Sequence, residues 1–119
     1  MNTSPNKPGI LVRPRIYLKD TITFGPGKID LLRQVGETRS IAAAARALGL
    51  PYKRAWLLID LLNRGFGRPV VETATGGKGG GGALLTPLGQ QLIDCYDALE
   101  ATLNASASKE LQALRDLAD

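Results

Sequence analysis

The sequence contains no histidine and a single cysteine, Cys95, among its 119 residues. These absences exclude a zinc site built from cysteine and histidine, a disulfide within the chain, a Cys/His dyad and a Ser/His/Asp triad. We therefore expect a protein that is not an enzyme and that holds no metal ion or cofactor.

Long hydrophobic runs are also missing. Residues 1–9 carry Asn, Thr, Ser, Lys and two prolines in place of the apolar core of a signal peptide, and no apolar run reaches the length that spans a membrane. A single thiol suits a reducing compartment. We expect a cytoplasmic protein that does not associate with membranes.

The net charge of +4 is small, but its distribution along the chain is uneven. Residues 1–82 contain 13 basic and 5 acidic side chains, whereas residues 83–119 contain 2 and 6. The front of the chain thus carries +8 and the tail −4. A basic segment followed by an acidic one indicates a surface that binds a polyanion.

The N-terminal part of the chain predicts an arm, a strand and a helix. Residues 1–14 contain three prolines and show no periodicity, which is typical of a flexible or loosely docked arm. Apolar and polar residues alternate from Arg15 and predict one half-buried strand that ends at Gly25. A first helix is expected from Pro26, which suits a first helical turn, to a stop at Gly36.

Two further helices joined by a short turn are predicted next. Ser40 is a suitable N-cap for a second helix over 41–48, which is rich in alanine and ends at Gly49. Pro51 opens a third helix that runs to about Arg64. Two helices linked by a short turn that contains glycine are typical of a helix-turn-helix.

The remaining chain predicts a hairpin and a long helix. Residues 69–75 and 83–85 form short strands around a glycine-rich loop over 76–82, which is the pattern of a wing. The fold class is therefore mainly α with a small β-hairpin wing, a winged helix-turn-helix over 15–85. The segment 86–119 is expected to be a C-terminal dimerisation helix.

The start of the third helix carries the strongest candidates for DNA contacts. Tyr52, Lys53 and Arg54 lie in the N-terminal turn, which is where a recognition helix touches base edges. The alternative is a charged helix start that is merely solvated. Ala55 begins the stripe that faces the core, while Trp56 on one flank is either a core residue or an interface residue.

Three other residues are candidates for contacts with phosphates. Arg39 and Ser40 precede the second helix, where a guanidinium and a helix N-terminus together grip a phosphate. Lys78 is the one charged residue of the glycine loop, which lacks the order of residues of a P-loop. A loop of glycines allows a close approach to the DNA backbone, although such composition alone also suits a disordered loop.

The last helix differs in character from the rest. Asp94, Asp97 and Glu100 would repel phosphates and are expected to form a solvated face. A leucine stripe on the same helix needs a partner, most simply a second copy of the chain. The serines near 106–108 predict a bend or a restart of the helix there.

Three segments of the sequence resemble a known family. The residues 52–56 (YKRAW), 74–83 (ATGGKGGGGA) and 85–90 (LTPLGQ) are similar to the N-terminal DNA-binding domain of ModE-type molybdate-dependent transcriptional regulators. Residues 37–65 show a broader and weaker similarity to LysR-type helix-turn-helix regions. The resemblance implies a homodimeric winged helix-turn-helix that binds a palindromic operator on double-stranded DNA.

The same resemblance leads to an expectation about molybdate binding. Full-length ModE-type regulators continue into molybdate-binding domains, whereas this sequence stops at Asp119. We therefore expect that molybdate is not bound by this chain and that the chain is a sequence-specific DNA-binding regulator. The alternatives are a protein-interaction module and a protein that senses an oxyanion without binding DNA directly.

Overall fold

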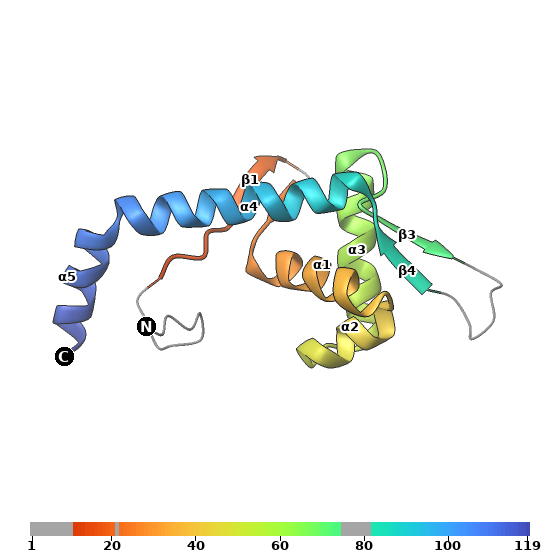
Figure 1. Cartoon of the computed structure of the whole chain (residues 1–119), viewed down its shortest axis with the longest axis horizontal. Coiled ribbons are helices and arrows are strands. Elements are labelled where there is room, and N and C mark those ends of the chain that lie inside the picture. The colour runs from red at the N-terminus through yellow and green to blue at the C-terminus, as the bar shows by residue number, and fades with distance from the viewer. Residues whose placement is uncertain (1–10, 21, 75–81) are drawn as a thin grey trace.

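The computed structural model describes residues 11–20, 22–74 and 82–119. Its elements are, in chain order, β1 (Ile16–Lys19), β2 (Ile22–Phe24), α1 (Pro26–Thr38), α2 (Ile41–Leu48), α3 (Tyr52–Phe66), β3 (Val71–Ala74), β4 (Gly82–Leu85), α4 (Pro87–Ser106) and α5 (Ser108–Ala118). Helices α1, α2 and α3 gather below one end of the long helix α4, and β3 and β4 project from that end (Figure 1). The fold is mainly helical with two antiparallel strand pairs, which confirms the predicted fold class.

The first strand region is a hairpin, so the prediction of one continuous strand was wrong. Strands β1 and β2 pair antiparallel, with Ile16 opposite Phe24 and Tyr17 opposite Thr23. Asp20, the polar residue that interrupts the alternation of the sequence, lies in the connecting turn. The turn lets β2 bury its apolar side chains in the core while most of β1 stays exposed.

Helix α1 continues to Thr38, two residues beyond the predicted stop at Gly36. The helix is ended by Arg39, which adopts a left-handed backbone (φ 57°) and donates its N–H to the carbonyl of Val35 at 2.8 Å. Gly36 serves packing instead: a Cβ there would lie 2.8 Å from the Cδ1 of Leu85. The glycine thus allows the wing strand β4 to pack closely against α1.

The predicted caps of α2 and α4 are confirmed. The hydroxyl of Ser40 accepts a hydrogen bond from the N–H of Ala43 at 3.0 Å, and Gly49 ends α2 with φ 68°. Thr86 caps α4 in the same way, accepting from the N–H of Gly89 at 3.1 Å. These side chains satisfy helix N–H groups that would otherwise have no partner.

A single apolar core joins α1, α2, α3, the wing and α4. The stripe predicted for the third helix is buried, and so are two alanines that let α2 approach its neighbours. The buried cluster comprises Phe24, Ile29, Leu31, Leu32, Val35, Ile41, Ala44, Ala45, Ala55, Ile59, Leu62, Val70, Val71, Ala83, Ile93 and Tyr96. This core fixes α3 against α1 and α2 and leaves the opposite side of α3 in solvent.

Ion pairs hold the end of the arm and α1 against α4. Arg13 pairs with Asp30 at 2.8 Å and with Glu100 at 3.3 Å, and Arg33 pairs with Asp97. Asp97 and Glu100 are therefore engaged by arginines, while Asp94 and Asp97 remain exposed, so the solvated face expected for the last helix is confirmed only in part. Arg13 of the arm reaches Glu100 because residues 11–14 run along α4 (Figure 1).

Tyr96 ties α4 both to the core and to the arm. Its ring is buried and meets Phe24 edge-to-face at 5.7 Å between centroids, while its hydroxyl donates to the carbonyl of Pro14 at 2.7 Å. Burial, and to a smaller degree the charge of Glu100, raises the pKa of this phenol.

Replacing Tyr96 by Phe should lower the free energy of unfolding by about 1 kcal/mol, because the packing stays and one partly buried hydrogen bond is lost. The raised pKa stabilises the wild type below the ordinary tyrosine pKa of about 10, and this contribution disappears as the pH rises through the raised value. Urea unfolding at neutral and alkaline pH measures both effects. Equal stability of Tyr96→Phe and wild type at neutral pH would contradict the expected contribution of the hydrogen bond.

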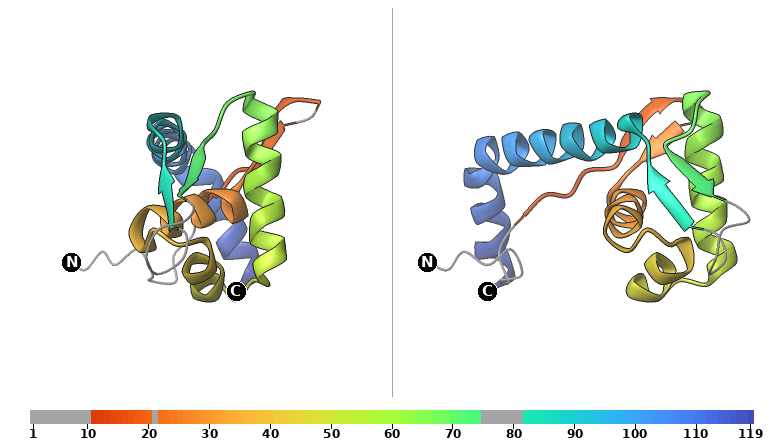
Figure 2. Two further views of the ribbon diagram at one scale, coloured as in Figure 1. Left: turned by 90° about the vertical axis from the view of Figure 1, so that its right-hand side faces the viewer. Right: turned by 45° about the vertical axis from the view of Figure 1, so that its right-hand side comes forward.

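The predicted interruption of the last helix is confirmed. Helix α4 ends at Ser106 and α5 begins at Ser108, and Ala107 between them has a non-helical backbone. Helix α5 leaves α4 at a steep angle (Figure 2). None of the helices in the described part of the chain combines the length and the apolar character that a membrane span needs.

Candidate nucleic-acid interface

The N-terminal turn of α3 presents three predicted site residues to solvent. Tyr52, Lys53 and Arg54 are all exposed, whereas the next residue, Ala55, is fully buried. This pattern follows from the phase of the helix, because the stripe that begins at Ala55 packs into the core. Successive residues point about 100° apart, so the three side chains lie on different flanks of the same helix end.

Tyr52 faces the wing side of α3. Its ring lies edge-to-face on the indole of Trp56, with centroids 6.4 Å apart. Trp56, which the sequence left open between core and interface, retains 37% of its exposure. The aromatic pair therefore forms one wall of a groove and leaves ring edges accessible to a ligand.

This groove, called the wing groove below, has a volume of about 270 Å³ and lies between α2, α3 and the wing. It brings the predicted residues Ser40 and Tyr52 together with both wing strands, a proximity that the sequence alone did not predict. Its lining consists of Ser40, Ile41, Ala42, Tyr52, Trp56, Thr73, Ala74, Gly82 and Ala83.

Arg39 connects the helix-turn-helix to the wing. Its carbonyl accepts a hydrogen bond from the N–H of Ala83 at 3.0 Å, which draws strand β4 toward the start of α2. A Cβ at Gly82 would lie 3.4 Å from the same carbonyl oxygen, so the wing strand approaches closely there. Arg39 is exposed and directly precedes Ser40, the N-cap of α2.

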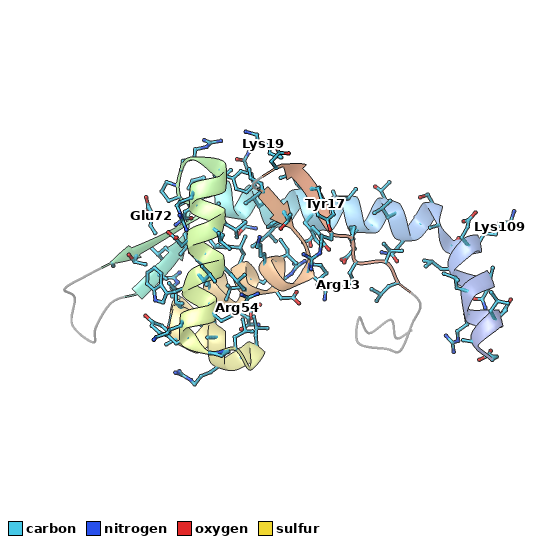
Figure 3. The ribbon with its side chains drawn as sticks, turned by 180° about the vertical axis from the view of Figure 1, so that it is seen from behind. Arg13, Tyr17, Lys19, Arg54, Glu72 and Lys109 are labelled. Carbon is cyan, nitrogen blue, oxygen red and sulfur yellow. The ribbon has the colours of Figure 1, made fainter. Side chains whose placement is uncertain are left out.

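Arg54 lies on the opposite flank of α3 from the aromatic pair, on the side of α1 (Figure 3). There it lines a second cavity, called the basic cleft below, with a volume of about 380 Å³. The cleft is lined by Arg15, Thr23, Gly25, Gly27, Lys28, Leu50, Arg54, Leu58 and Leu61. Sequence reasoning missed Arg15 and Lys28, because no spacing in the chain relates them to the third helix.

Lys78, the sixth predicted site residue, lies outside the described residues. For the part of the chain that is described, ion pairs engage three cations of the basic front segment, namely Arg13, Arg33 and Arg64. The front-segment cations that form no ion pair with another described residue are Arg15, Lys19, Lys28, Arg39, Arg46, Lys53, Arg54 and Arg68. Much of the positive charge is thus available to a polyanion.

Residues 27–90 match the profile of the bacterial regulatory helix-turn-helix protein, lysR family. The chain is 51% identical over 78 residues to the molybdenum-pterin-binding protein MopB of Rhodobacter capsulatus, covering 66% of this chain and 29% of that protein. It is 44% identical over 84 residues to the DNA-binding transcriptional dual regulator ModE of Escherichia coli, covering 71% and 32%. The match thus spans about a third of the length of these curated relatives.

Solved structures show the same fold. The CbnR_DBD–DNA complex aligns with a TM-score of 0.57 at 18% identity and covers 74% of this chain and 95% of that one. The BenM_DBD complex with benA site 1 DNA aligns with a TM-score of 0.55 at 18% identity and covers 73% and 95%.

Proposed function

Since this chain belongs to the lysR family of bacterial regulatory helix-turn-helix proteins, we propose that it binds duplex DNA through α3 and the wing and regulates transcription. The observation that carries the proposal is the exposed basic turn at the start of α3, whose cations form no ion pair with another described residue and which lies beside a groove that opens toward the wing. A helix of this kind enters the major groove with its N-terminal turn foremost.

The proposed roles follow from where each side chain lies. Lys53 and Arg54 reach base edges or nearby phosphates, and the phenol of Tyr52 reaches either. Arg39 and Ser40 hold a backbone phosphate at the start of α2, where the helix N-terminus favours negative charge. Lys78 adds positive charge and contacts the DNA backbone.

We further propose that the protein acts as a homodimer on a palindromic operator. Helices α4 and α5 carry apolar side chains without cover in a single chain, with Leu99 36%, Leu114 62% and Leu117 84% exposed. A two-fold dimer through this part of the chain would place two copies of α3 about 34 Å apart, which is one turn of DNA.

Selection of bound duplexes from a random pool tests the proposal without a prior guess of the operator. The expected result is enrichment of a palindrome with half-sites one DNA turn apart, bound by a species with the mass of a dimer in sedimentation. Failure to enrich any duplex would reject DNA binding and favour the protein-interaction module. Stabilisation by stoichiometric molybdate, measured by thermal unfolding, would instead favour an oxyanion sensor.

The division of roles between α3 and the wing makes a separate prediction. Lys53→Ala should weaken binding to the selected operator by about tenfold and relax the base preference at one position of each half-site. Lys78→Ala should weaken binding to all sequences alike and lower the salt slope by about one per protomer. Binding measured on a panel of single-base operator variants checks both, and the reverse pattern would overturn the assignment.

A further inference from the structure

We propose that the basic cleft between α1 and α3 is a binding site for a phosphate group. The cleft collects cations that lie far apart in the sequence: Arg15 before β1, Lys28 in the first turn of α1, and Arg54 in the first turn of α3. No carboxylate occurs among the described residues that line it. Three positive charges without a counter-charge around one cavity create a local potential that attracts an anion.

The surroundings of Lys28 show that these charges affect one another. Burial lowers the pKa of Lys28, and the positive charges of Arg15 and Arg54 lower it further. An anion in the cleft would offset the repulsion among these three cations, which favours binding of the anion. The side chain is also held in place, because its Nζ donates to the carbonyl of Thr23 at 2.8 Å and to the Thr23 hydroxyl at 3.2 Å. Of the three ammonium hydrogens, one remains for a ligand.

The walls of the cleft suit a phosphate that carries an organic group. Leu50, Leu58 and Leu61 supply apolar surface to the cleft, and Leu58 and Leu61 share one face of α3 with Arg54. The volume of about 380 Å³ exceeds what a bare oxyanion fills and falls within the range of sites for small ligands. A phosphate attached to a sugar would place its charge on the cations and its carbon atoms against the leucines.

Two sources supply such a group: the backbone of duplex DNA, or a free phosphate compound in solution. The DNA source rests on the function proposed above, since Arg54 belongs to the turn of α3 that is expected to enter the major groove. In that case the cleft grips the DNA backbone on the flank of α3 that faces away from the wing. The free source does not depend on DNA binding.

The first experiment follows backbone amide signals of the full chain during titration with inorganic phosphate. Wild type and the control Lys109→Gln, which removes the same charge from exposed α5, should show saturable shifts at Gly27 and Lys28. Lys28→Gln should abolish the saturable shifts. Arg15→Gln is a second variant, which keeps the test valid if loss of the Thr23 contacts unfolds Lys28→Gln.

The second experiment measures the affinity of the same proteins for duplex DNA at several salt concentrations. If the DNA backbone fills the cleft, Lys28→Gln and Arg15→Gln each lower affinity by about tenfold and the salt slope by about one per protomer, while Lys109→Gln changes neither. If the source is a free compound, the phosphate shifts occur but the two cleft variants bind DNA like the control.

The outcomes separate this site from the proposed function. Phosphate shifts in a wild-type protein that binds no duplex would support the cleft and reject the function. The proposal about the cleft is overturned if inorganic phosphate causes no saturable shifts at Gly27 and Lys28 and if the cleft variants match Lys109→Gln in DNA affinity.

Discussion

The affinity of the protein for its operator is expected to fall by a factor on the order of 10³ to 10⁵ between about 50 and 200 mM salt. Each phosphate that a basic side chain neutralises releases condensed counterions, and added salt opposes that release. The cations assigned to DNA in one protomer number three to four, taken from Arg39, Lys53, Arg54 and Lys78. Two protomers would therefore neutralise about six to eight phosphates, with a logarithmic salt slope near −0.9 for each.

The salt slope also tests the oligomeric state. A single protomer with about four phosphate contacts would lose only about two orders of magnitude in affinity over the same salt range. Fluorescence anisotropy of a labelled operator at five or six salt concentrations measures the slope. Lys109→Gln on α5 should leave it unchanged, whereas an affinity that is insensitive to salt in the wild type would argue against the whole polyanion surface.

The largest expected effect on stability comes from Gly89→Ala. Gly89 is buried in the first turn of α4, and a Cβ there would lie 2.3 Å from the carbonyl oxygen of Val70. The same oxygen accepts a hydrogen bond from the N–H of Thr86 at 3.1 Å, so the clash acts on the junction between the wing and α4. Because the obstacle is backbone, rotamer changes do not relieve it. We expect a loss of about 3 kcal/mol in the free energy of unfolding.

Gly27→Ala provides the matched control. Gly27 also lies in the first turn of a helix that opens with proline, but a Cβ there would have no neighbour within 4 Å. Alanine is the better helix former, so this variant should be neutral or more stable by about 0.5 kcal/mol. Urea unfolding of both variants measures the difference in stability. Equal unfolding midpoints for Gly89→Ala and Gly27→Ala would show that the close approach at Gly89 does not constrain the fold.

Local signals in the sequence were enough to predict the helix-turn-helix. The caps Ser40 and Thr86, the stop at Gly49 and the buried stripe from Ala55 all depend on residues within a turn or two of each other. Such features obey short-range rules of hydrogen bonding and periodicity. The same rules failed at Gly36. That glycine makes room for the side chain of Leu85, which is distant in the sequence, and it does not end its helix.

Contacts between distant segments account for the rest of what the sequence did not predict. The pairing of Arg13 with Glu100 joins residues 87 apart in the chain, and no local pattern marks either one for it. The basic cleft depends in the same way on tertiary packing, since Arg15, Lys28 and Arg54 meet only once β1, α1 and α3 have docked. Charge counting indicated that a basic surface exists, but not how its cations divide between two flanks of α3.

The hydrogen bond between Ala83 and Arg39 has a consequence for mutagenesis. Both of its atoms belong to the backbone, so replacing either side chain by another that tolerates the local geometry leaves this link between wing and helix-turn-helix in place. Alanine substitution of exposed wing residues would then leave this link intact and report lost contacts with DNA. To break the link itself, the amide would have to be removed, for example by an ester bond at position 83 introduced by chemical synthesis.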